Sequence, residues 1–215
     1  DYAHITPAEF IDDALVERMN AAHVVVGENF RFGRMAAGTP EVLIAECGDR
    51  GIEAHVVPVA ADSAPWSSTR IRRLVASGDV LGAAEVLGRH FSLTGTVVHG
   101  DHRGRELGYP TANVQTAPGM LVPADGVYAG WLDAAGERFP AAISVGTNPQ
   151  FDGADLRIEA FCIDREGLDL YHLPARVIFA RHLREQAVFD SLEAFLGQMA
   201  LDVEQARFVL DTPIA

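Results

Sequence analysis

Residues suited to binding phosphate and a metal ion are concentrated in the stretch from Gly100 to Asn113. Its glycines would let the backbone fold closely around phosphate oxygens and point amide groups at them. Thr111 and Asn113 have one residue between them, so on an extended chain their side chains lie on the same face. A hydroxyl beside a carboxamide oxygen suits Mg²⁺, which takes its other oxygens from water and phosphate. The residues that we expect to contact phosphate are Gly100, Arg103, Gly104, Gly108, Thr111 and Asn113. By spacing alone, a plain glycine-rich loop is the alternative interpretation.

Glu159 is a candidate general base. Strand alternation puts it on one face with Arg157, Phe161 and Ile163. A carboxylate beside two large apolar residues is partly shielded from water, which suits a group that accepts a proton during a reaction. On the residues alone, a solvated glutamate with no catalytic role is the alternative interpretation.

The basic residues exclude several kinds of chemistry. All 17 are arginine, since the chain contains no lysine. Schiff-base chemistry, the P-loop lysine and the strand lysine of protein kinases are therefore excluded. Any ATP chemistry must use backbone amides, arginine, hydroxyls and a metal ion. The net charge of −13 disfavours nucleic acid and anionic membranes as partners, so we expect small-molecule partners and leave self-association open.

The overall composition is typical of a soluble globular protein, with 48% hydrophobic and 22% charged residues. No run of about eighteen apolar residues predicts a membrane span, and no charged-then-apolar leader opens the chain. Cys47 and Cys162 lie far apart without CxxC spacing, so we expect two small core residues rather than a disulfide or a metal pair. The expected location is the cytoplasm.

The first sixty residues are typical of alternating helices and strands. Thr6, Pro7 and Glu9 form a helix-start signal of a hydroxyl cap, a proline and a glutamate. The expected elements are a helix from residue 7, a strand over 23–26, a helix over 39–47 and a strand over 53–59. This series predicts a right-handed crossover and part of a doubly wound α/β sheet. A small α/β domain complete in itself is the alternative.

The remainder of the chain is typical of a β domain introduced by helices. Helical patterns occupy residues 66–88, with a break at Gly78 and Asp79. The expected strands lie over 92–98, 126–132, 140–145, 156–163 and 175–179, and a final helix lies over 191–210. Short antiparallel strands with frequent turns predict a barrel or a sandwich. We expect two domains, residues 1–88 and residues 89–215.

Several motifs, in order along the chain, resemble those of riboflavin kinases. Residues 107–113, Leu-Gly-Tyr-Pro-Thr-Ala-Asn, are similar to the Pro-Thr-Ala-Asn motif of that family. Further matching segments are 123–128, 145–149, 157–160, 169–171 and 183–185. The resemblance runs from about residue 87 to residue 202 and implies an antiparallel β-barrel with a C-terminal helix. Gln150 departs from the family pattern, which has threonine there, and this bears on flavin-side packing more than on the reaction class.

The resemblance also implies a reaction, the phosphorylation of riboflavin by ATP to give FMN. Thr111 and Asn113 would contact ATP phosphate and Mg²⁺, and Glu159 would be the catalytic base. Arg184 would lie near the flavin or the phosphate, with a structural salt bridge as an equal alternative. A non-catalytic flavin-binding barrel is the alternative function.

The N-terminal part resembles the FMN adenylyltransferase domain that bacteria fuse to this kinase in bifunctional FAD synthetases. Residues 24–33 and 67–72 carry this resemblance. It implies that Asn29 lies on the flavin side and that Ser68, Thr69 and Arg72 bind ATP phosphates. The Gly-x-Phe-Asp-Gly-x-His-x-Gly-His loop of that family does not occur in this sequence. We therefore expect an incomplete adenylyltransferase domain.

Overall fold

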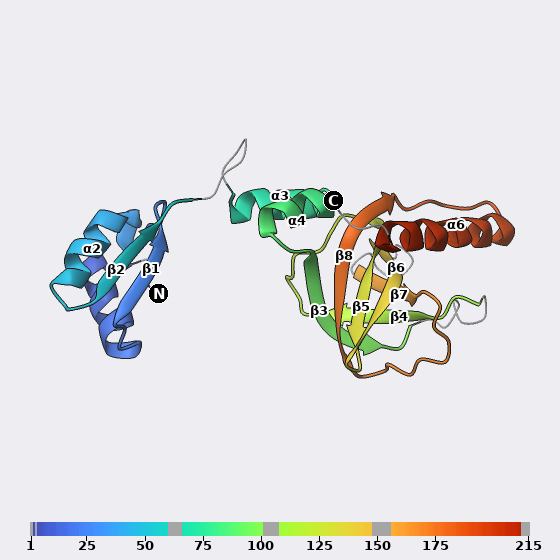
Figure 1. Cartoon of the computed structure of the whole chain (residues 1–215), viewed down its shortest axis with the longest axis horizontal. Coiled ribbons are helices and arrows are strands. Elements are labelled where there is room, and N and C mark those ends of the chain that lie inside the picture. The colour runs from blue at the N-terminus through green and yellow to red at the C-terminus, as the bar shows by residue number, and fades with distance from the viewer. Residues whose placement is uncertain (1, 3, 60–65, 101–107, 148–155, 212–215) are drawn as a thin grey trace. The chain divides into compact units, whose positions relative to one another are not determined.

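The computed structural model describes residues 2, 4–59, 66–100, 108–147 and 156–211. Its residues form two compact units, Asp1–Trp66 and Ser67–Ala215 (Figure 1). Within the described ranges, every helix is too short or too polar to cross a membrane.

Unit 1 is an α/β arrangement around a parallel pair of strands. Its elements are α1 (Pro7–Phe10), η1 (Ile11–Arg18, a π-helix), β1 (His23–Gly27), η2 (Arg34–Ala36), α2 (Pro40–Gly48) and β2 (Glu53–Val57). The helix-start signal is confirmed, because Thr6 and Glu9 form a reciprocal capping box before Pro7. Strands β1 and β2 pair in parallel, with His23 opposite Glu53. This agrees with the expected piece of a doubly wound sheet.

The helices of unit 1 cover one face of its sheet. Among the residues described in this unit, six buried side chains form the core: Ile11, Leu15, Phe32, Leu43, Cys47 and Ile52. Val24, Val26 and Ala54 pack against this core from the strands. The alternate strand residues, among them Val25 and Val57, are exposed. The β1–β2 sheet therefore has a core face and an exposed face.

Unit 2 is a closed antiparallel barrel preceded by two helices and followed by one. The helices are α3 (Ser68–Ala76), α4 (Val80–Leu87) and α6 (Leu192–Asp211). The strands are β3 (Phe91–Val98), β4 (Thr111–Thr116), β5 (Gly126–Ala134), β6 (Glu137–Thr147), β7 (Leu156–Cys162) and β8 (Pro174–Arg184). They close in the order β3-β4-β7-β6-β5-β8. The expected barrel with its C-terminal helix is confirmed, and closure removes the exposed sheet edges that an open sheet would have.

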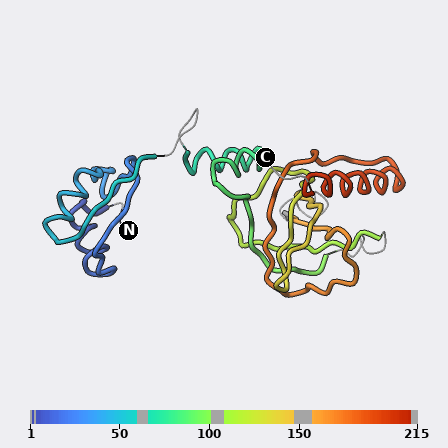
Figure 2. Tube along the Cα trace, viewed as in Figure 1, coloured from blue at the N-terminus to red at the C-terminus, as the bar shows by residue number. Residues whose placement is uncertain are grey.

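Helix α6 lies against the outside of the barrel, as the trace in Figure 2 shows. Ala206 of the helix is buried with Ala129, Ala142 and Ile163, which point outward from the barrel wall. Small residues in the wall let the helix approach closely. Helix α6 therefore covers part of the outer surface of the barrel.

The packing boundary between the units differs from the expected domain boundary at residue 88. Helices α3 and α4 belong to the unit that contains the barrel. The reason is that α4 contacts β8 and β3, and its Val80 is buried in the barrel core. The packing of the structure divides the chain between Trp66 and Ser67. The boundary at residue 88 concerns where the two family modules meet, and it stays a prediction.

Strand β4 is not among the strands expected from the sequence. Its residues Thr111–Thr116 include Asn113 and Gln115, which give little β-strand signal. Pairing with β3 and β7 forms the strand instead. Tertiary contacts therefore decide the conformation of the segment that carries the candidate site.

Candidate functional site

Three of the predicted site residues converge where β4 pairs with β7. Asn113 lies directly opposite Glu159 in the antiparallel register, and Thr111 lies opposite Phe161. The hydroxyl of Thr111 donates a hydrogen bond of 3.2 Å to Oε2 of Glu159. The expectation that Thr111 and Asn113 share a face is consistent with this register.

The shared face is the outer face of the barrel. The residues next to these site residues along the strands point inward, and Val114, Ile158 and Ala160 are buried in the barrel core. Thr111, Asn113 and Glu159 are half-buried and point the other way. The site is therefore an outer-surface site with restricted access to water.

Gly100 packs directly against Asn113. A Cβ added at residue 100 would overlap the carboxamide group of Asn113. Only glycine allows this approach, so the chain just after β3 holds the Asn113 side chain in place. Gly108 adopts a φ of +82° in a turn and is exposed. Arg103 and Gly104, also expected at this site, lie outside the described residues, as does Gln150.

Three further side chains lie close to Glu159 or to its neighbours in the sheet. Ser144 of β6 lies opposite Glu159 in the register. Gln186 donates hydrogen bonds of 3.0 Å to the Ser144 hydroxyl and to the Val145 carbonyl. The Tyr109 ring lies 5.2 Å from the Phe161 ring. Tyr109 lies within the 107–113 motif, and Ser144 and Gln186 directly adjoin the matched segments 145–149 and 183–185. Their positions near Glu159 and Phe161 depend on strand pairing that a single sequence does not reveal.

Arg184 makes a bidentate ion pair with a buried carboxylate in α6. Its Nε and Nη2 donate to Asp202 at 2.9 and 2.6 Å, and its Nη1 donates to the Glu185 carbonyl at 2.8 Å. The Asp202 residue is 4% exposed and also accepts from Gln198. These contacts support the salt-bridge alternative, since they occupy all three nitrogens of the guanidinium. A role of Arg184 in flavin binding stays a prediction.

The residues expected for the adenylyltransferase are exposed in the two units. Asn29 follows β1 in unit 1. Ser68, Thr69 and Arg72 are exposed on the first turns of α3 in unit 2, where the Ser67 hydroxyl caps the helix by accepting from the Arg70 amide at 3.2 Å. A shared role for these four residues stays a prediction.

The convergent groups fit a hard cation such as Mg²⁺. The Thr111 hydroxyl, the Asn113 carboxamide and the Glu159 carboxylate offer oxygen donors on two adjacent strands. Oxygen ligands with room for water and phosphate are what Mg²⁺ requires. The chemistry that this arrangement can perform is metal-assisted transfer of a phosphoryl group with a carboxylate base beside it.

A closed antiparallel barrel with a C-terminal helix is the arrangement implied by the kinase resemblance. The family model described as riboflavin kinase matches residues 87–210, which include all six barrel strands. This match covers more than half of the chain, and the chain belongs to the riboflavin kinase family. The model described as FAD synthetase matches residues 1–70.

Individual relatives agree with the two family matches. The bifunctional riboflavin kinase/FMN adenylyltransferase of Pseudomonas fluorescens is 35% identical over 94% of this chain and 65% of its own length. That of Escherichia coli K12 is 32% identical over 96% of this chain and 66% of its own length. The chain thus spans slightly less than two thirds of these relatives.

A solved structure is similar across both units. The crystal structure of a macrolide-efflux protein from Streptococcus pneumoniae has a TM-score of 0.83 and 34% identity. The similarity covers 95% of this chain and 66% of that chain.

Proposed function

We propose that the barrel unit phosphorylates riboflavin with ATP, giving FMN and ADP. The observation that carries the proposal is the contact between Thr111 and Glu159, with Asn113 opposite Glu159 on the adjacent strand. This arrangement joins a carboxylate base to the oxygen donors that a nucleotide-bound cation needs. Membership of the riboflavin kinase family supports riboflavin as the acceptor.

In the proposed reaction, Glu159 orients the 5′-hydroxyl of the ribityl chain and accepts its proton. The hydroxyl oxygen forms a bond to the γ-phosphorus of ATP, and the bond from that phosphorus to the β–γ bridging oxygen breaks, releasing ADP. Thr111 and Asn113 would hold Mg²⁺, which when bound neutralises charge on the phosphates. Gly100 contributes by fixing Asn113, and Gly104, Gly108 and Arg103 are proposed to surround the phosphates.

We also propose that unit 1 and its following segment belong to an FMN adenylyltransferase. The family match over residues 1–70 and the names of the relatives support this assignment. The activity, its substrates FMN and ATP, and the roles of Asn29, Ser68, Thr69 and Arg72 are proposals for the protein as a whole. Because both reactions use ATP, we place them in the cytoplasm.

The decisive experiment is incubation of the 215-residue chain with riboflavin, ATP and Mg²⁺, followed by chromatographic separation of the flavins. FMN without FAD is the expected product. FAD would show that the missing phosphate loop is dispensable for adenylylation. Riboflavin that binds without being converted would contradict the kinase proposal and favour a flavin-binding barrel.

A further inference from the structure

The exposed face of the β1–β2 sheet carries a cluster of two histidines and a glutamate. His23 begins β1, and Glu53 lies directly opposite it at the start of β2. His55 lies two residues after Glu53 and therefore points from the same face of the strand. All three are exposed, on the side of the sheet away from the apolar core of unit 1.

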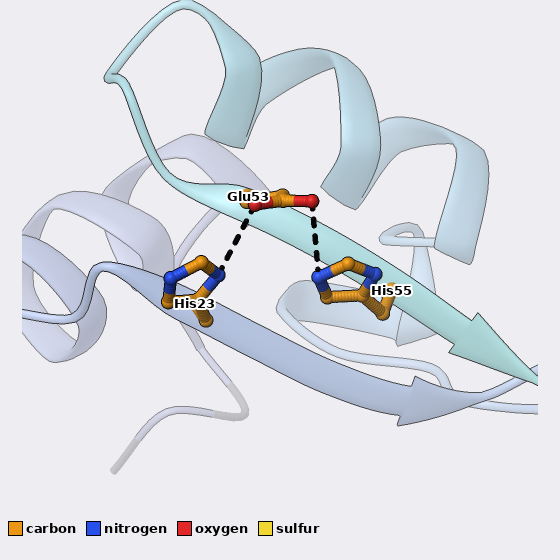
Figure 3. Close-up of side chains that lie close together, drawn as sticks. All are labelled: His23, Glu53 and His55. Atoms are coloured by element: carbon orange, nitrogen blue, oxygen red, sulfur yellow. Dashed lines mark ion pairs between the residues drawn. The ribbon is translucent and has the colours of Figure 1, made fainter.

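The three side chains point toward one another (Figure 3). Nδ1 of His23 lies 3.3 Å from Oε2 of Glu53, and Nε2 of His55 lies 3.3 Å from Oε1 of Glu53. The two imidazole rings are nearly parallel, with their centroids 6.1 Å apart. One ligand atom from each residue lies within 4.8 Å of the others.

The distance from each imidazole nitrogen to its nearest Glu53 oxygen suits a small transition-metal ion. With metal–ligand distances of about 2.0–2.2 Å and tetrahedral angles, neighbouring ligand atoms lie about 3.3 Å apart. Neutral imidazole and carboxylate are ligands for Zn²⁺, Co²⁺ and Ni²⁺, whereas Mg²⁺ and Ca²⁺ prefer sites made of oxygen alone. We propose that His23, Glu53 and His55 form a binding site for a divalent transition-metal ion of the zinc type.

Such an ion would connect the two strands of unit 1. One ligand comes from β1 and two come from β2, so binding would hold the strands in register at their N-terminal ends. Three protein ligands leave a coordination position for water, unlike the closed four-ligand sites that are purely structural. Because the ligands converge only when the strands are paired, the ion stabilises the folded form of unit 1.

The test is a calorimetric titration of the metal-free 215-residue chain with Zn²⁺, without nucleotide. The variants are His23→Asn, His55→Asn and Glu53→Gln, and the matched control is His4→Asn, an exposed histidine of unit 1 outside the cluster. One equivalent of Zn²⁺ should bind to the parent chain and to the control. Each histidine variant should bind at least about tenfold more weakly. Co²⁺ should give a visible absorption band that the histidine variants lose.

Hydrogen exchange supplies a readout that is independent of affinity. Zn²⁺ should slow exchange of the β1 and β2 amides in the parent chain and leave them unchanged in His55→Asn. The proposal is wrong if the parent chain binds no Zn²⁺. It is equally wrong if His23→Asn and His55→Asn bind Zn²⁺ as tightly as the parent, because the ion would then occupy another site.

Discussion

The hydroxyl of Thr111 donates a hydrogen bond of 3.2 Å to the carboxylate of Glu159 across two paired strands, although 48 residues separate them in sequence. This bond joins the motif expected to bind the nucleotide to the residue expected to accept the proton. It places both functions on the outer face of the barrel, beside the region that α6 covers. The site depends on the register of β4 with β7, because a slip of one residue would turn Glu159 into the core.

Glu159→Gln should abolish most of the proposed kinase activity without unfolding the barrel. The amide can still accept the Thr111 hydrogen bond but cannot take a proton from the substrate hydroxyl. We expect kcat to fall by about 10²–10⁴-fold, the usual contribution of a general base. Steady-state assays of FMN formation would measure this, with Glu166→Gln as a control at an exposed position between β7 and β8. A variant with the parent kcat would remove Glu159 from the mechanism.

Gly100→Ala should weaken ATP use by displacing Asn113. The added methyl group would overlap the Asn113 carboxamide, so that side chain or the β3 segment must move. We expect a higher KM for MgATP and a smaller effect on riboflavin. Gly197→Ala is the matched control, because residue 197 lies in α6 and a Cβ added there would meet open space. If both variants have the parent KM, Asn113 does not need a fixed position.

Local sequence signals were enough to predict most elements and the shared strand face of Thr111 and Asn113. The capping box at Thr6, the break at Gly78 and the alternation around Glu159 each depend on neighbouring residues, and the structure has all three features. Strand β4 and the proximity of Ser144 and Gln186 to Glu159 were beyond prediction. They depend on pairings between segments that are distant in sequence, and a single sequence does not specify such pairings.

The ion-pair partner of Arg184 is a second feature that the sequence does not predict. Arg184 lies in a matched motif, and a binding role and a structural role are both compatible with that position. Its partner Asp202 is 18 residues away in α6, and the helical pattern gave no reason to expect a buried carboxylate there. A buried charge needs a partner, and Arg184 supplies it.

Removing either member of the Arg184–Asp202 pair should loosen α6 from the barrel. Asp202→Asn and Arg184→Gln should each lower the free energy of unfolding of unit 2 by about 2–4 kcal/mol, since each leaves a partly buried charge without its partner. Thermal unfolding, together with the KM for riboflavin measured on the same samples, would distinguish a structural role of Arg184 from a binding role. A structural role predicts similar losses of stability in both variants. A raised KM for riboflavin in Arg184→Gln alone would establish a binding role.

Asp133 should make the barrel sensitive to acid. It accepts hydrogen bonds from Arg138 and from Arg176, which lie opposite it on the two neighbouring strands. The hydrogen bonds from Arg138 lower the pKa of Asp133 the most, burial raises it, and the hydrogen bonds from Arg176 lower it further. The resulting pKa is about 2. Its ordinary pKa in an unfolded chain is about 3.9. The contribution to stability is therefore complete above about pH 4 and is lost as the pH falls through about 2.

Asp133→Asn measures that contribution. At pH 7 the variant should be less stable than the parent by about 1–2 kcal/mol, a value reduced because the Asp133 side chain is partly exposed. The difference should shrink toward zero near pH 2. Urea unfolding at pH 7 and at pH 2.5 would measure the stability difference at each pH. The fluorescence of Trp131 in a Trp66→Phe background would report the unfolding. A difference that is the same at both pH values would contradict an electrostatic origin.

The two cysteines should report the order in which the units open. Burial raises the pKa of the Cys162 thiol to about 11 and also raises the pKa of Cys47, so neither forms much thiolate in the folded chain at pH 8. Among the described residues, unit 1 buries a cluster of six apolar side chains that includes Cys47, whereas the cluster that includes Cys162 has eighteen. Unit 1 should therefore open at a lower concentration of urea.

A thiol-specific reagent should accordingly modify almost no cysteine in the native chain and two in the fully unfolded chain. At intermediate urea concentrations, Cys47 should react first, and a Cys47→Ser variant should lose that early phase while keeping the later one. Reaction of Cys162 before Cys47 would mean that the barrel is the less stable unit, because each thiol becomes accessible only when the core around it opens.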